Sequence, residues 1–170
     1  MQNLEIRGLN FCTSKAALAA GTTTTFSTTG ATLYCIKGKA YSTAAGTNAA
    51  TPTTDAVTGA AFNAVGANKG CVFVICYDGD ATAANAINVI QGSIVDLDGA
   101  ASGANSQFTK GVPDFPYIPD TLTPIGYLIT RVGASGSAWT FGSSNLAGPP
   151  SNVKHDFVDV MVLPSTPQIP

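Results

Sequence analysis

Few residues of this sequence have side chains of the types that carry out catalysis. Its one histidine, His155, lies between Lys154 and Asp156, and any Ser-His-Asp triad would have to use it. Nothing nearby in sequence would orient the ring, so we expect a surface histidine in an exposed lead-in to the last strand. The sequence also contains no Gly-x-Ser-x-Gly elbow and no glycine pattern typical of a dinucleotide or phosphate loop. These observations favour a protein that is not an enzyme.

Two pairs of aspartates have a spacing that would suit metal ligands. Asp78 and Asp80 flank a glycine, and Asp96 and Asp98 flank a leucine. Each pair would place two carboxylates on one side of a strand end, where they could help to bind Ca²⁺. Neither pair completes the twelve-residue calcium-loop pattern, so ordinary turns are the favoured interpretation. We expect no metal ion or other cofactor.

The four cysteines are Cys12, Cys35, Cys71 and Cys76, and none belongs to a Cys-x-x-Cys pair. With only one distant histidine available, a zinc site has little support. The last three cysteines lie in apolar strand patterns, where free cysteine packs as a small hydrophobic residue. The odd separation of Cys71 and Cys76 places them on opposite faces of a strand. We expect all four thiols to be reduced.

Three aromatic residues, Tyr117, Tyr127 and Trp139, have side chains that could form a carbohydrate-binding platform. Aromatic residues at strand spacing more often pack in a core or against another subunit. A glycosidase would also need a pair of carboxyl groups in a cleft, and acidic residues are scarce here. Core or subunit packing is therefore the favoured role.

The charge of the chain is low for its size. It has 170 residues and a net charge of −2, and 11% of its residues are charged, against about 25% in a typical soluble domain. A free monomer usually carries more charge for solubility, so this composition favours a surface that other subunits partly cover. The alternative is a surface made polar by Thr, Ser and Asn instead of by charged groups.

Neither a nucleic acid nor a membrane is indicated as a partner. Lys37 and Lys39 are the only close pair of cations, and no apolar run approaches the roughly 18 residues of a membrane-spanning helix. Residues 1–10 contain no apolar core of a signal peptide. We therefore expect a protein that is made and kept in a cytoplasm.

Residues 111–141 form the stretch around which the rest of the chain is expected to be organised. Residues 125–132 are rich in Ile, Tyr, Leu and Val and predict a strand, residues 133–137 predict a turn, and residues 139–141 are aromatic and β-prone. Four prolines precede this strand and make the first part extended, because each ring fixes φ and removes an N–H donor: Pro113, Pro116, Pro119 and Pro124. An extended segment is therefore expected to lead into a hairpin.

Residues 70–77, Gly-Cys-Val-Phe-Val-Ile-Cys-Tyr, are apolar on both strand faces, which is typical of a central strand that is covered on both sides. Ser14 would cap one or two helical turns over residues 14–20, and residues 42–58 predict a long surface loop. Gly92 indicates a bulge. The other predicted strands cover residues 4–11, 22–28, 31–41, 87–97 and 157–163.

Eight or nine strands with Gly, Asn, Asp and Pro turns, and no long helix, predict an all-β fold. We expect an antiparallel β-sandwich or a jelly-roll-like barrel with extended terminal arms. Residues 12–163 would form one β-rich domain, residues 1–11 an N-terminal arm or edge strand, and residues 164–170 a Pro-rich C-terminal arm.

The sequence of residues 124–146 resembles that of a group of virion proteins of tailed bacteriophages. The resemblance lies in Pro-Ile-Gly-Tyr-Leu-Ile-Thr (124–130), Gly-Ala-Ser-Gly (133–136) and Phe-Gly-Ser-Ser-Asn-Leu (141–146), with Gln91-Gly92-Ser93 and the proline run before them. Within this group the chain is most similar to the capsid cement, or decoration, proteins. The resemblance carries no catalytic motif.

The resemblance implies a non-enzymatic β-rich protein, most often a homotrimer, on the outer face of the capsid. Its partner would be the major capsid protein, bound at the junctions between capsid subunits. The terminal arms would carry much of the attachment. We expect capsid or subunit contacts from eight residues: Leu4, Ile6, Leu9, Phe115, Tyr117, Ile118, Trp139 and Ile169.

Two other classes remain open. The first is a receptor- or glycan-binding module of a head fibre or tail fibre, in which the loop over residues 42–58 and the aromatic residues would form the binding face. The second is a virion-associated hydrolase, which is disfavoured because the sequence shows neither a triad nor a pair of acids.

Overall fold

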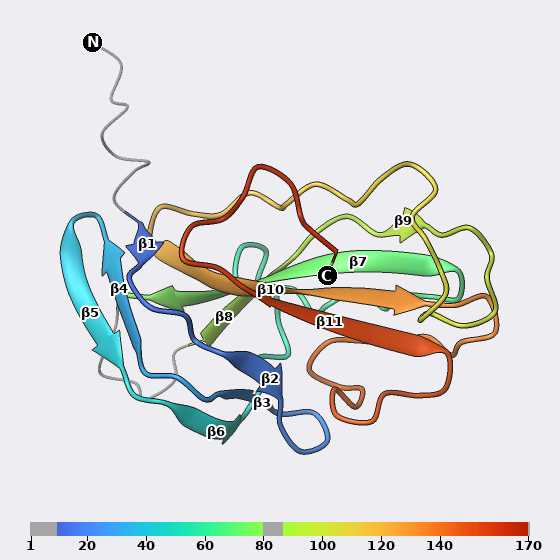
Figure 1. Cartoon of the computed structure of the whole chain (residues 1–170), viewed down its shortest axis with the longest axis horizontal. Helices are drawn as coiled ribbons and strands as arrows, with labels where there is room; N and C mark the ends of the chain where they lie inside the picture. Colours follow the sequence, from blue (N-terminus) through green and yellow to red (C-terminus); the bar gives the residue numbers. More distant parts are fainter. Residues whose placement is uncertain (1–9, 80–86, 170) are drawn as a thin grey trace, which may run out of the picture.

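The computed structural model describes residues 10–79 and 87–169 (Figure 1). In these ranges the chain consists of eleven strands in three antiparallel sheets, with no helix. The predicted all-β antiparallel sandwich is therefore confirmed. Residues 4, 6 and 9, for which we expect contacts with a partner, lie outside the described residues.

The largest sheet has the strand order β11-β10-β7-β8, and β9 pairs with the start of β7. Its strands are β7 (Lys69–Asp78), β8 (Ile87–Gln91), β9 (Val95–Asp96), β10 (Leu122–Val132) and β11 (Val153–Asp159). β7 has paired strands on both sides, which confirms the central strand predicted over residues 70–77.

The two faces of β7 belong to two separate hydrophobic clusters. Phe73 and Ile75 lie in the first cluster, and Val72 and Val74 lie in the second. Side chains alternate along a strand, so a run that is apolar at every position fills both clusters. Cys71 and Cys76 fall in different clusters, so the prediction that they lie on opposite faces is confirmed.

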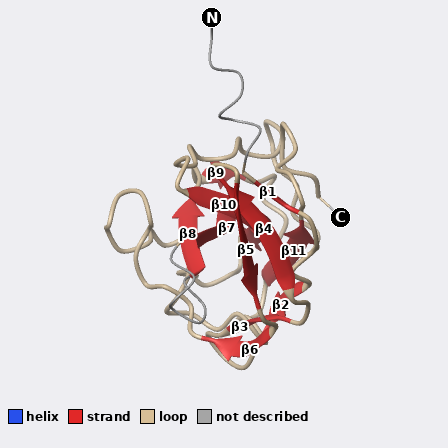
Figure 2. Cartoon of the chain, turned by 90° about the vertical axis from the view of Figure 1, so that its left-hand side faces the viewer, coloured by secondary structure: helices blue, strands red, loops and turns tan. Residues whose placement is uncertain are grey.

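The first cluster is covered by two small sheets, which form the second layer of the sandwich (Figure 2). One has the order β1-β4-β5 and the other β2-β3-β6. Figure 2 looks from the side of β5 and shows β4 and β5 in front of the large sheet. The strands are β1 (Phe11–Cys12), β2 (Leu18–Ala20), β3 (Phe26–Thr28), β4 (Thr32–Ile36), β5 (Lys39–Thr43) and β6 (Gly46–Ala49).

A bulge near the start of β10 explains how a proline fits into this strand. The pairing with β7 shifts between Pro124 and Gly126, which leaves Ile125 as the extra residue. β11 pairs with β10 only from Gly126 onward, so Pro124 has a strand partner on one side only. A Cβ at Gly126 would lie 2.3 Å from Leu18 Cδ1 and 2.5 Å from the Val158 carbonyl oxygen. Glycine therefore allows the two layers to approach closely here.

The structure corrects two predictions in the first part of the chain. The helical turns predicted over residues 14–20 are wrong, because none of these residues is helical, Leu18–Ala20 forms β2, and Ala17 has a positive φ of 52°. The single strand predicted over residues 31–41 is a hairpin of β4 and β5. Its two turn residues, Lys37 and Gly38, have φ of 49° and 80°, as a type I′ turn requires.

Three other element boundaries also differ from the prediction. The predicted loop over residues 42–58 contains the end of β5 and all of β6. The predicted strand over residues 87–97 is divided into β8 and β9, and Gly92 lies between them. The last strand is Val153–Asp159 instead of residues 157–163, because after β11 the chain turns away, with Val162 67% exposed.

The second cluster is covered by irregular segments instead of strands. Phe115 and Ile118 pack on it from the segment of residues 113–124, which we call the proline-rich segment. Leu163 and Ile169 pack on it as well. The Gln168 amide donates to the Tyr127 hydroxyl at 2.9 Å. Gln168 and Ile169, in the Pro-rich segment at the end of the chain, therefore contact the second face of their own sheet.

Candidate functional site

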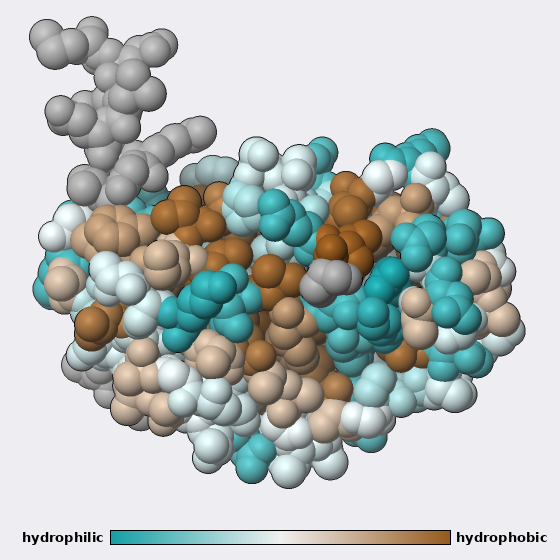
Figure 3. Space-filling model, in the orientation of Figure 1, coloured by the Kyte–Doolittle hydropathy of each residue, from teal (hydrophilic) through white to brown (hydrophobic). Residues whose placement is uncertain are grey.

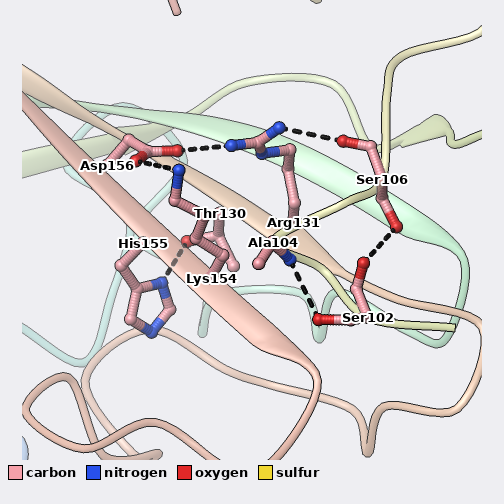
Figure 4. Close-up of polar contacts among 8 residues, drawn as sticks. All are labelled: Ser102, Ala104, Ser106, Thr130, Arg131, Lys154, His155 and Asp156. Carbon is pink, nitrogen blue, oxygen red and sulfur yellow. Dashed lines mark hydrogen bonds and ion pairs between the residues drawn. The ribbon is translucent and has the colours of Figure 1, made fainter. Parts of the chain in front are cut away.

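His155 is the first residue to consider for catalysis. It lies in β11 opposite Thr130 of β10, and its Nδ1 is 3.1 Å from the Thr130 hydroxyl (Figure 4). Its ring packs on Trp139, with ring centroids 4.5 Å apart, and its Nε2 is shielded from solvent without a well-formed hydrogen bond. The prediction of a surface histidine is therefore wrong. His155 is two residues away from both Val153 and Phe157, which pack on the first cluster, so on a strand all three share one face. This alternation was the sequence signal for burial that we missed.

Asp156 does not form a catalytic relay with His155. The two residues are neighbours on one strand, so their side chains point to opposite faces. The Asp156 carboxylate binds Arg131 Nη2 at 2.7 Å and Lys154 Nζ at 2.9 Å. Thr130 is fully buried, so its hydroxyl is not exposed to a substrate. This arrangement stabilises the pairing of β10 with β11 and is not the geometry of a Ser-His-Asp triad.

Arg131 joins the large sheet to the loop before the proline-rich segment. Its side chain is 3% exposed, and its Nη1 donates to the Ser106 carbonyl at 2.8 Å. The Ser106 hydroxyl in turn donates to the Ser102 carbonyl at 3.0 Å (Figure 4). The charge of Arg131 is thus paired with Asp156 inside the protein, and Arg131 holds the loop in place. Its part in this site is structural.

We expect the protein to lose stability in acid because of His155. Burial lowers the pKa of His155 from 6.5 to about 4, although the Asn145 carbonyl and Asp156 raise it. The folded state then binds this proton less readily than the unfolded state, so stability falls as the pH drops from the unfolded to the folded pKa. We expect a loss of about 3 kcal/mol between about pH 7 and about pH 4 from this group.

Urea unfolding of the wild type and of His155→Gln over this pH range measures the effect. The variant lacks the titrating ring, so its stability should fall less steeply with acid. Equal slopes for the two proteins would show that His155 is not the responsible group.

The described members of the two aspartate pairs, Asp78, Asp96 and Asp98, make turn and strand contacts. The Asp96 carboxylate binds Lys69, and the Asp98 carboxylate accepts the Ala100 amide at 3.1 Å. Asp78 accepts a hydrogen bond from Asn88 at 3.0 Å, and Asp80 lies outside the described residues. Over residues 10–79 and 87–169, no group of three or more His, Cys, Asp or Glu side chains has a metal-binding arrangement.

All four cysteines are free, and their exposure predicts their reactivity. Cys12, Cys71 and Cys76 are buried and Cys35 is partly exposed. Burial raises the pKa of Cys12 to about 11 and that of Cys71 to about 12, and it also raises the pKa of Cys76. Since the thiolate is the form that reacts, we expect iodoacetamide to label Cys35 first in the native protein.

Mass spectrometry of the alkylated protein tests this order. Four labelled thiols are expected after denaturation without a reductant. Rapid native labelling of Cys76, or a pair of thiols that resists labelling in denaturant, would contradict the expectation.

Of the five described residues for which we predicted a contact role, Trp139 does not lie with Phe115, Ile118 and Ile169. Trp139 is fully buried, and its Nε1 donates to the Asn145 carbonyl at 2.9 Å, so the prediction of a surface contact for Trp139 is wrong. Phe115, Ile118 and Ile169 are partly buried on the second cluster. Among the described members of this set, Tyr117 alone has a largely exposed side chain, at 73%.

The structure does not support the disfavoured alternative of a carbohydrate-binding platform built from Tyr117, Tyr127 and Trp139. Trp139 belongs to the first cluster and Tyr127 to the second, on opposite faces of the sheet. Both are fully buried, whereas Tyr117 is exposed. The three rings therefore do not share a surface.

An open groove of about 480 Å³ lies on the surface of the described chain. We call it the Tyr117 groove. It lies where the first described residue, the proline-rich segment, the start of β10 and the chain after β11 meet. Figure 3 shows hydrophobic surface gathered in the upper half of the molecule, where Figure 1 places the C-terminal segment and the connection before β10. Residues that line the groove include Asn10, Tyr117, Leu122, Met161, Val162 and Leu163.

One rim of the Tyr117 groove is fixed by polar contacts. Asn10 Nδ2 donates to the carbonyls of Asp120 and Leu122 at 2.8 and 3.0 Å, and its Oδ1 accepts the Lys37 amide at 2.9 Å. Lys37 Nζ also pairs with the Asp120 carboxylate at 2.9 Å. By contrast, Met161 is 46% exposed and Val162 is 67% exposed. The groove thus combines a hydrogen-bonded rim with exposed apolar side chains. This combination is better suited to contact with another surface than to catalysis.

In the part of the chain that the structure describes, no helix has the length and apolar character needed to span a bilayer. Comparisons of the chain with protein-family models, with curated proteins and with solved structures find no match.

Proposed function

We propose that this protein is a non-enzymatic structural protein of a tailed-bacteriophage virion, and that it binds the outside of the capsid as a cement protein. The observation that carries this proposal is the Tyr117 groove, with three exposed apolar side chains in one place: Tyr117, Met161 and Val162. Apolar groups gathered on a surface usually mark a contact with another molecule.

The composition and the resemblance also support the proposal. With 11% charged residues, the chain has little charge to remove from water when a surface is covered. The resemblance to phage virion proteins includes residues 124–130, which lie in β10, and the first of them, Pro124, lines the groove. The partner would be the major capsid protein, and the resemblance favours a homotrimer on the virion exterior.

Such a protein would act by burying surface across the junctions between capsid subunits. A stable contact buries about 800 Å² per partner, which is more than one groove provides. Several chains on neighbouring sites, or a trimer that binds at once, would convert weak single contacts into tight overall binding through avidity. Covered junctions would then open less readily, and the shell would be more stable.

Rebinding to particles from which this protein has been removed tests the proposal. Tyr117→Asp combined with Val162→Asp should weaken rebinding by at least about tenfold, because charged groups replace the apolar contact. Val57→Asp is the matched control, since Val57 is also exposed, at 45%, but does not line the groove. Unchanged rebinding of the double variant would exclude the Tyr117 groove as the docking surface. Light scattering of the isolated protein tests the expected homotrimer.

The alternative of a glycan-binding fibre module has less support. The aromatic side chains it would use are divided between the two hydrophobic clusters. Residues 46–49 of its predicted binding loop pair with β3 as β6. A glycan array with the purified protein separates this alternative from a cement protein.

A further inference from the structure

β11 lies at one end of the large sheet, so one of its edges has no strand partner among the described residues (Figure 2). Two hydrogen bonds just beyond the ends of its pairing with β10 show which residues face that edge. The Gly133 amide donates to the Asn152 carbonyl at 2.9 Å, and the Val160 amide donates to the Ile125 carbonyl at 3.1 Å. Hydrogen-bonded pairs alternate along an antiparallel ladder. The even-numbered residues of β11 therefore bond to β10, and the odd-numbered ones face the open edge.

The backbone N–H and C=O groups of His155 and Phe157 thus point away from the sheet. Over residues 10–79 and 87–169, no hydrogen bond joins these backbone groups to another residue. Buried backbone groups are nearly always paired, so these groups face water, and both residues are partly exposed. An edge with unpaired backbone groups is a template for another extended strand.

The sequence of β11 is complementary to itself when two copies run antiparallel. It reads Val153, Lys154, His155, Asp156 and Phe157. In a pair centred on His155, Lys154 of each copy lies opposite Asp156 of the other, and Val153 lies opposite Phe157. Opposite charges and apolar side chains directly across two strands stabilise the pair. A pair centred one residue later would place the two Asp156 carboxylates opposite each other, which is unfavourable.

The existing contacts of these residues are compatible with such a pair. Arg131 binds Asp156 Oδ2, whereas Lys154 binds Oδ1 and has a side chain that is 36% exposed. Lys154 can therefore keep its own aspartate and also approach that of the other copy. On the other face, Val153 and Phe157 pack on the first cluster and are partly exposed. A second copy would cover the exposed part of these two side chains.

We propose that β11 pairs with β11 of a second copy about a two-fold axis at His155, which joins the two large sheets into one. A two-fold axis gives both copies the same contact. The contact uses neither the Tyr117 groove nor a capsid, so it does not depend on the proposed function. In the homotrimer that the resemblance favours, it would join one trimer to another.

An NMR sample that mixes ¹³C-labelled and unlabelled full-length protein tests the register. In the proposed pair, residues 154 and 156 of different chains form a non-hydrogen-bonded pair, in which the two Cα atoms are about 4.5 Å apart. An isotope-filtered experiment should therefore show a contact between the Lys154 Hα of one chain and the Asp156 Hα of another. The absence of any contact between chains along β11, or contacts that report another register, would overturn the proposal.

Hydrogen exchange at several protein concentrations tests the open edge. The amides of His155 and Phe157 should become at least about tenfold more protected from dilute to concentrated protein. The Asp156 amide, which bonds to β10, should be protected throughout and shows whether the sheet is intact. Protection of the His155 and Phe157 amides that does not depend on concentration would overturn the proposal.

A charge reversal tests the complementarity of the two strands. Lys154→Glu would place a second carboxylate opposite Asp156 of the other copy, so the concentration-dependent protection should fall at least about tenfold. Lys110→Glu makes the same charge change at an exposed lysine between β9 and β10 and should keep the protection. Equal protection in Lys154→Glu and the wild type would overturn the proposed pairing.

Discussion

Replacing Phe73 by alanine is expected to lower the free energy of unfolding by about 3–5 kcal/mol. Phe73 is fully buried at the centre of β7. Its ring stacks on Phe141 at 5.2 Å between centroids, and it meets Phe62 and Trp139 edge to face at 6.0 and 5.7 Å. Alanine would leave a cavity among three rings that come from two separate connections, Phe62 before β7 and Trp139 and Phe141 between β10 and β11, so the site cannot close easily. Urea denaturation of both proteins measures the difference.

Leu33→Ala is the control for this prediction. Leu33 also lies in a strand, β4, but it is 53% exposed. Its replacement should change stability by no more than about 0.5 kcal/mol. A loss below about 1 kcal/mol for Phe73→Ala would show that the packing around β7 is not the main source of stability.

The strands whose own residues show a full hydrophobic or β-prone pattern could be predicted from the sequence. β7 is apolar on both faces because it has a layer on each side, and this alone marks a central strand. β10 was also predicted, because Ile, Tyr, Leu and Val follow one another after the proline run. In both strands the local pattern and the tertiary environment require the same residues.

The errors fall where tertiary contacts outweigh local preference. The alanines of residues 14–20 favour a helix, but Leu18 and its neighbours pair with β3, and the Leu18 amide donates to the Asp159 carboxylate at 2.9 Å. β11 is polar at Lys154, His155 and Asp156, so the sequence did not predict a strand at these residues. In the structure their polar side chains have partners within the protein. Local sequence does not contain these partners.

The Tyr117 groove could not be predicted as a site because distant segments build it. Tyr117 was predicted to make contacts, whereas Met161 and Val162 were assigned to a strand. The chain brings them together only because residues 160–169 fold back over the second face of the sheet. Their exposure depends on that path, which no local pattern specifies.

Removing the carboxylate of Asp156 should be nearly as damaging as removing the ring of Phe73. The Asp156 and Arg131 side chains are 9% and 3% exposed, and their charged groups are 2.7 Å apart. Asp156→Leu would leave the guanidinium of Arg131 buried without its counter-charge, at an expected cost of about 3–5 kcal/mol. Lys154, whose side chain is 36% exposed, would lose little because water can solvate it.

The double variant Arg131→Met/Asp156→Leu shows whether this loss comes from an unpaired charge or from packing. With both charges absent, no desolvated ion remains, so most of the lost stability should return. A remaining loss of about 1–3 kcal/mol is expected, because the Ser106 carbonyl no longer receives the hydrogen bond from Arg131. Denaturant unfolding of the wild type, both single variants and the double variant gives the coupling energy. If the double variant is no more stable than Asp156→Leu, the cost comes from packing around β11 and not from the buried charge of Arg131.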